Sequence, residues 1–83
     1  MAPTIPRKRE NRALTVQGHG SAQRSALAPF EHFCTFFRDA QGAEWLWFAP
    51  REKDARETFK AGQTLTVSAF WNNGTIARPV IVS

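Results

Sequence analysis

The chain has little of what disulfide scaffolds, zinc sites and membrane spans require. Its 83 residues include one cysteine, two histidines and no tyrosine. Cys34 has no partner for an intrachain disulfide, and with His19 and His32 it supplies too few ligands for a tetrahedral zinc site. No apolar run approaches the roughly 18 residues of a membrane-spanning helix. We therefore expect a fold held by packing alone, with no metal, no cofactor and no membrane insertion.

Motifs of targeting and catalysis are also missing. The start, Met1 to Arg12, holds four Arg or Lys residues but no apolar segment of a secretory signal, so we expect a cytoplasmic protein. A chain this short forms one domain and buries only about 60% of its unfolded surface, which leaves little room for an enclosed catalytic cleft. It has no Gly-x-Ser-x-Gly sequence and no phosphate-cradling glycine loop. We expect no catalytic residues and no enzyme.

The positive charge is concentrated at the amino end. The chain has 11 basic and 7 acidic residues, a net charge of +4. Residues 25–83 hold six of each sign, so the whole excess lies within residues 1–24. We divide the chain into a flexible basic arm, residues 1–12, and a folded domain, residues 13–83. Such an arm is either a tether for phosphates or a solvated tail that aids solubility.

Alternating apolar residues predict strands at both ends of the domain. One strand covers residues 13–17, followed by a stretch with Gly18 and Gly20 that is either a long loop or a glycine-bent continuation of the strand. Another covers residues 64–71, with Trp71 on its core face and Phe70 on its wetter face. Asn73-Gly74 predicts a hairpin turn into a last strand, residues 75–82, in which Pro79 indicates a free edge.

The middle of the chain predicts an aromatic hairpin and a short helix. Residues 30–38 and 43–49 flank Asp39-Ala40-Gln41-Gly42, a sequence typical of a short turn. Residues 51–59 carry acid–base pairs four apart and predict about two helical turns that lean on the sheet through Phe59.

The hairpin has large apolar groups on both faces, so its orientation has two solutions. Either Trp45 and Trp47 face outward with Leu46 and Phe48 in the core, or the reverse holds. Leucine and phenylalanine are the more usual core residues, and a buried indole N–H needs a hydrogen-bond partner. We therefore expect both tryptophans to face water.

The order of these elements resembles that of the OB-fold, a five-stranded Greek-key barrel with one helix between its third and fourth strands. The resemblance spans residues 13–83. Two stretches, Phe37 to Gly42 leading into Trp45, and Lys60 to Val67, are similar to parts of single-stranded nucleic-acid-binding OB domains. The expected fold is thus mainly β, a small OB-like Greek-key barrel. The chain ends in Val80-Ile81-Val82-Ser83 rather than in an acidic tail, so we expect no recruitment of repair proteins by such a tail.

The resemblance implies a binding surface on the second and third strands, flanked by the loops that join strands 1–2 and 4–5. Bases would stack on exposed aromatic side chains, and basic side chains would hold phosphates. The expected aromatic contacts are Trp45, Trp47, Phe36 and Phe70. The expected basic contacts are Arg38, Arg24, Arg7, Lys8, Arg9 and Arg12.

These expectations describe a non-catalytic module that binds single-stranded DNA or RNA with little sequence preference. The alternative is a protein-interaction module, such as a mobile-element-encoded inhibitor or accessory subunit, that uses the same aromatic face on a protein partner or on a second copy of the chain. The neutral charge balance of residues 25–83 favours the alternative.

Overall fold

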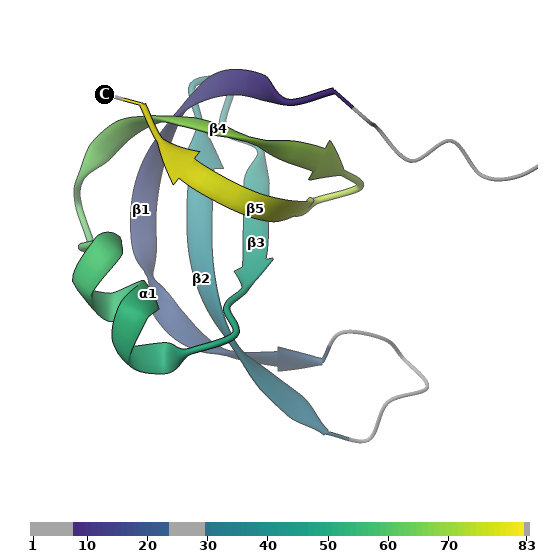
Figure 1. Ribbon diagram of the computed structural model, residues 1–83, viewed down its shortest axis with the longest axis vertical. Coiled ribbons are helices and arrows are strands. Elements are labelled where there is room, and N and C mark those ends of the chain that lie inside the picture. The colour runs from purple at the N-terminus through teal and green to yellow at the C-terminus, as the bar shows by residue number, and fades with distance from the viewer. Residues whose placement is uncertain (1–7, 24–29, 83) are drawn as a thin grey trace, which may run out of the picture.

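A computed structural model describes residues 8–23 and 30–82 of the chain. It is mainly β, with five strands in one sheet and one short helix between the third and fourth strands, as the sequence predicts (Figure 1). The elements are β1 (Glu10–Gln23), β2 (Glu31–Asp39), β3 (Glu44–Phe48), α1 (Glu52–Thr58), β4 (Thr64–Asn72) and β5 (Thr75–Ile81).

The five strands form a closed barrel in the order β1-β2-β3-β5-β4. Neighbouring strands run antiparallel except β3 and β5, which are parallel and meet at one residue pair, Leu46 and Thr75. The ring closes because β1 is long enough to pair with β4 through its first half and with β2 through the remainder. The helix α1 lies at one end of this barrel (Figure 1).

Strand β1 is longer at both ends than the sequence indicates. It begins at Glu10, which pairs with Ala69 of β4, so residues 10–12 belong to the sheet and not to a flexible arm. The predicted boundary after Arg12 is wrong at this point, because backbone pairing with β4 extends over these polar residues. At its other end β1 bulges between Val16 and Gly18 and continues to Gln23, which is the glycine-bent continuation.

Both predicted hairpin turns are present, and each is stabilised by its own residues. The Oδ1 atom of Asp39 accepts hydrogen bonds from the backbone N–H groups of Gln41 and Ala43, both at 2.9 Å. Between β4 and β5, Asn73 and Gly74 adopt φ angles of 43° and 82°, the left-handed pair that a tight hairpin turn of this type requires. These turns fix the register of the strands that they join.

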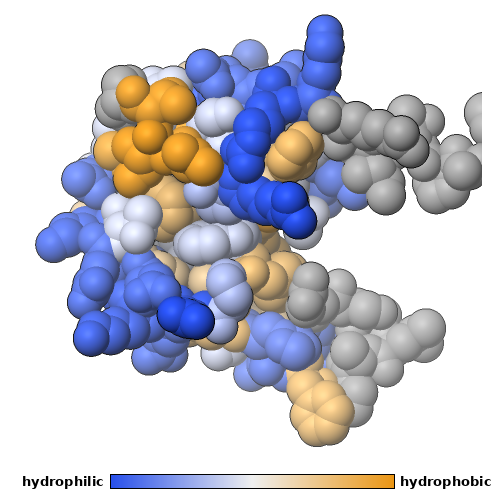
Figure 2. Space-filling view, viewed as in Figure 1, coloured by the Kyte–Doolittle hydropathy of each residue, from blue (hydrophilic) through white to orange (hydrophobic). Residues whose placement is uncertain are grey.

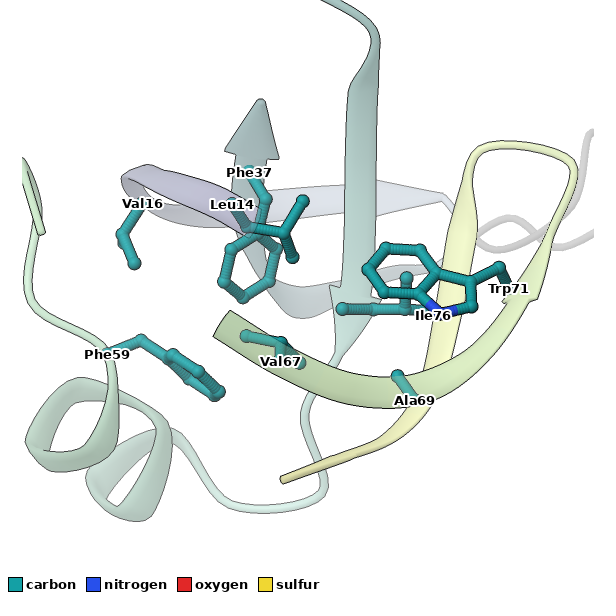
Figure 3. Packing of buried hydrophobic residues seen from close by; sticks show 8 residues of the cluster. All are labelled: Leu14, Val16, Phe37, Phe59, Val67, Ala69, Trp71 and Ile76. Atoms are coloured by element: carbon teal, nitrogen blue, oxygen red, sulfur yellow. The ribbon is translucent and has the colours of Figure 1, made fainter. Parts of the chain in front are cut away.

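The core contains alternate residues from four strands and the residue that ends the helix (Figure 3). Phe59 caps α1 at its carboxyl end and is 1% exposed. Its ring meets Phe37 edge to face at 5.1 Å and Trp47 at 5.4 Å, so it closes the end of the barrel beside α1. The cluster consists of Leu14, Val16, Phe37, Phe59, Val67, Ala69, Trp71 and Ile76.

His19 joins three elements at the same end of the barrel. One ring nitrogen, Nδ1, lies 2.9 Å from the buried hydroxyl of Thr35, and Nε2 donates to the carbonyl of Phe59 at 2.8 Å. The imidazole also stacks on Phe33 with ring centroids 5.6 Å apart. The side chain thereby ties β1 and β2 to the end of the helix, and this half-buried imidazole has a hydrogen-bond partner at both nitrogens.

The surface includes one exposed aliphatic patch, and no helix within the described residues is long and apolar enough to cross a membrane. The patch consists of Val80, Ile81 and Val82, which are 52%, 38% and 49% exposed. It forms an orange area in Figure 2, at the end of β5.

Because the Phe59 ring closes one end of the barrel, we expect a large loss of stability when this ring is removed. We expect Phe59→Ala to lower the free energy of unfolding by about 3–5 kcal/mol, because it leaves a cavity among aromatic rings. Phe30→Ala, at a residue that is 71% exposed, is the matched control and should change it by less than about 0.5 kcal/mol. Urea unfolding followed by circular dichroism measures the free energy of unfolding of both variants. Equal losses would contradict the closing of the barrel end by Phe59.

Candidate functional site

The two tryptophans expected on the outer face turn toward the core. Trp45 lies opposite the buried Phe37 in the β2–β3 pairing, and its ring meets Trp71 edge to face at 5.0 Å. Trp47 meets Phe59 in the same way at 5.4 Å. Both side chains are half-buried and pack against the core cluster. The prediction that both rings lie bare to water is therefore wrong.

The inward orientation is possible because the indole N–H of Trp45 has a partner. Nε1 of Trp45 donates to Oδ2 of Asp39 at 3.1 Å, across the β2–β3 turn. This hydrogen bond is the main cause that lowers the pKa of Asp39, aided by the backbone N–H groups of Ala43 and Gln41 and by the charge of Arg12, against partial desolvation of the carboxyl. The carboxylate of Asp39 thus supplies the hydrogen-bond partner that the indole N–H of Trp45 needs when the ring faces the core.

Two of the expected phosphate-binding arginines are held on the barrel by aromatic rings. The Arg12 guanidinium lies 4.6 Å from the ring centroid of Trp71 and 5.3 Å from that of Trp45, and it forms an ion pair with Glu10 at 3.1 Å. Arg9 lies 4.9 Å above the ring of Phe70. Neither belongs to a freely moving arm, because cation–π contacts hold both guanidinium groups against the sheet.

Of the other basic residues predicted to bind phosphate, two are described by the structure and two are not. Lys8 is exposed next to the start of β1, and Arg38 is exposed near the end of β2. Arg7 and Arg24 lie outside the described residues.

The outer face of β2 and β3 carries a different set of apolar residues. Phe36 and Leu46 pair across the two strands and point away from the core, since their neighbours on each side point inward. The Phe36 ring lies against Gly20 of β1: a Cβ atom built on that glycine would be 2.9 Å from Cε2 of the ring. The absence of a side chain at position 20 therefore leaves room for the Phe36 ring.

These side chains border a groove of about 620 Å³ between the outer sheet and the β4–β5 turn. Gly18, Phe36 and Leu46 line it from the sheet, and Asn73 to Thr75 line it from the turn. Figure 2 shows the molecule hollowed on this side, between the β4–β5 end and the β1–β2 hairpin. Of the four aromatic residues predicted to contact bases, Phe36 and Trp45 line this groove. Trp47 and Phe70 are not among its lining residues.

The charges beside the groove balance one another. Glu44 lines it, and its Oε1 atom accepts a hydrogen bond from Nη2 of Arg38 at 3.2 Å, so the expected phosphate ligand is already paired. The pair is exposed and therefore weak, which leaves Arg38 able to exchange its carboxylate for another anion.

Sequence reasoning missed Leu46, Glu44 and Thr75 as residues of this surface. It did place the stretch that begins with Gly18-x-Gly20 beside the binding face, and Gly18 lines the groove. Leu46 was assigned to the core, and this error follows directly from the reversed orientation of the hairpin.

Cys34 lies on the same outer side of β2 but is fully buried, and burial raises the pKa of its thiol. Among the described residues, no group of three or more His, Cys, Asp or Glu side chains is placed to hold a metal ion.

The lowered pKa of Asp39 predicts an acid-sensitive contribution to stability. Since the folded state prefers the ionised carboxylate, this contribution is present above the ordinary value of 3.8 and is lost as the pH falls through the lower folded value. We expect Asp39→Asn to destabilise the protein at neutral pH and the difference from wild type to shrink below about pH 4. Urea midpoints across this range measure it, with Asp54→Asn on α1 as the control; a constant difference would contradict the assignment.

No protein-family model matches the chain, and neither does any curated protein or any solved structure. The features that bear on function are therefore the barrel, the groove on its outer face and the charges beside that groove.

Proposed function

We propose that the barrel is an OB-fold and that it binds single-stranded DNA or RNA in the groove between Phe36 and the β4–β5 turn, with little sequence preference. The strand order, the closure of β1 onto β4 and a helix between β3 and β4 support the OB assignment. In that fold the outer face of the second and third strands is the ligand surface, and the groove lies there.

The observation that carries the proposal is the Phe36 ring lying over Gly20 at the base of an open groove. A base can stack on an aromatic ring regardless of its identity, because every base has a flat π face. Leu46, paired with Phe36, widens the apolar base of the groove. Trp47 contributes indirectly, by packing against the core beneath these strands, and Trp45 both packs against the core and lines the groove.

Phosphates are assigned to the basic groups that remain available beside this surface. Arg38 is exposed and loosely paired, and Lys8 is exposed near the start of β1. Arg9 and Arg12 are already engaged by aromatic rings, so they set the positive potential of the barrel end rather than reach for the ligand.

Removing the Phe36 ring is expected to weaken binding without unfolding the barrel. Phe36→Leu should lower the affinity for oligo(dT) about 5- to 150-fold, the equivalent of one stacking contact of about 1–3 kcal/mol. Phe30→Leu, the same replacement at an exposed ring that does not line the groove, is the control and should leave affinity unchanged. Fluorescence anisotropy of a labelled oligonucleotide at low salt measures both variants, and wild-type protein that binds no single strand under these conditions would end the proposal.

Neutralising Glu44 is expected to strengthen binding. Glu44→Gln removes a carboxylate that lines the groove and frees Arg38, so the affinity for single strands should rise and its salt dependence should become steeper. Glu57→Gln on α1, which changes the net charge equally, is the control. The measurement is anisotropy over a salt series, and an unchanged or weaker affinity for Glu44→Gln contradicts phosphate binding at this position.

The second candidate ligand for this face is a protein partner. Glu44→Gln and its control Glu57→Gln also distinguish this partner from a nucleic acid. The balanced Arg38–Glu44 pair favours a protein partner, because such a pair does not select for phosphate. A protein surface that presents its own cation to Glu44 would be bound less tightly after Glu44→Gln, the opposite sign to the nucleic-acid result.

A further inference from the structure

A second hollow adjoins the groove at the point where β3 and β5 touch. The two strands meet only at Leu46 and Thr75, where the Leu46 N–H donates to the carbonyl of Gly74 at 2.8 Å. Beyond this contact they diverge, and this second hollow of about 460 Å³ lies between them. Thr75 lines both hollows, so they adjoin at this residue, and we call the two together the track. We call the second hollow the β3–β5 seam.

The seam combines apolar walls with one cation. Phe48 and Pro50 line it from the β3 side, and Ile76, Ala77 and Arg78 line it from β5. Arg78 is exposed, and among the described residues no carboxylate lies within ion-pair distance of its guanidinium. This differs from Arg38 at the groove, which has a carboxylate partner.

The backbone at Arg78 is held in a conformation that non-glycine residues rarely adopt. Its φ angle is 51°, in the left-handed region, and it is followed by Pro79. In the β4–β5 pairing these two residues stand opposite the single residue Ala69, since Ser68 pairs with Val80 and Phe70 with Ala77. Strand β5 thus bulges at Arg78, and bulges of this kind redirect a side chain.

Arg9 holds the bulge in place. Its Nη1 atom donates to the carbonyl of Arg78 at 2.8 Å and to the carbonyl of Ser68 at 2.9 Å, while its guanidinium lies over the ring of Phe70. One buttressing arginine therefore bridges the bulged strand and its neighbour. A strained residue that a second side chain holds in this way is typical of a functional position.

We infer that the β3–β5 seam is a second nucleotide subsite, in which Arg78 contacts a phosphate of the same single strand whose base stacks on Phe36. The inference rests on the proposed function of the groove. An unpaired guanidinium beside apolar walls fits a phosphate followed by a base, and the two hollows adjoin at the shared Thr75. A strand that reaches the seam must be longer than one that fills the groove alone.

The test compares short and long oligo(dT), of about 4 and about 12 nucleotides, which lie within the range of OB-fold site sizes. Arg78→Asn removes the charge while keeping a residue that tolerates a positive φ angle. Lys53→Gln on α1 removes one charge from a residue that lines neither hollow and is the matched control. Anisotropy titrations between about 50 and 200 mM salt give the affinity and its salt slope.

We expect Arg78→Asn to lower the affinity for the long oligonucleotide and to make its logarithmic salt slope shallower by about 0.7, the value for one lost phosphate contact on a single strand. Binding of the short oligonucleotide should match that of wild type and of Lys53→Gln. Arg78→Lys should restore the slope. If thermal unfolding shows that Arg78→Asn is not folded, Arg78→Gly makes the same comparison, because glycine also accepts this backbone angle.

Two results would overturn the inference in different ways. Equal slopes for Arg78→Asn and Lys53→Gln with the long oligonucleotide would remove Arg78 and the seam from the binding path, while leaving the groove intact. A wild-type protein that binds neither oligonucleotide would overturn the proposed function itself.

Discussion

Alternation of side chains across the β2–β3 pair is the constraint on which the candidate surface depends. Once Phe37 and Trp45 face each other inside the barrel, the pleat sends Phe36 and Leu46 to the outside. A shift of one residue in this register would exchange the two sets completely. The large indole rings then fill the interior, and the smaller apolar residues line an open groove.

Several side chains outside the hairpin hold this register. Phe59, delivered by the end of α1, offers its ring to Trp47 and to Phe37, and Trp71 of β4 offers an edge-to-face contact to Trp45. Trp71 is anchored in turn by donating its indole N–H to the carbonyl of Glu10 at 2.9 Å. An aromatic core assembled from distant segments lets an 83-residue chain with a single cysteine close a barrel without an intrachain disulfide.

The sequence predicted the elements better than their faces, for physical reasons. Asn73-Gly74 and Asp39 specify turns through local hydrogen bonds and φ angles, so the four strands that these turns join were identified close to their observed bounds, whereas β1 is longer than predicted at both ends. The orientation of the hairpin depends on Phe59 and Trp71, which reach it only through tertiary packing. Asp39 was noted as a turn residue, but its second oxygen also accepts the Trp45 indole N–H, a contact six residues apart that no periodicity reveals.

If a single strand binds to the outer face of β2 and β3, nuclear magnetic resonance can locate the contact directly. Backbone amide shifts recorded during titration with oligo(dT) should change most at Gly18, Phe36, Leu46 and Gly74, which surround the groove. Amides of the outer face of α1, such as Lys53 and Glu57, should stay fixed. Shifts centred on the helix, or spread evenly over the barrel with the groove unaffected, would contradict the central claim that the outer face of β2 and β3 is the binding surface.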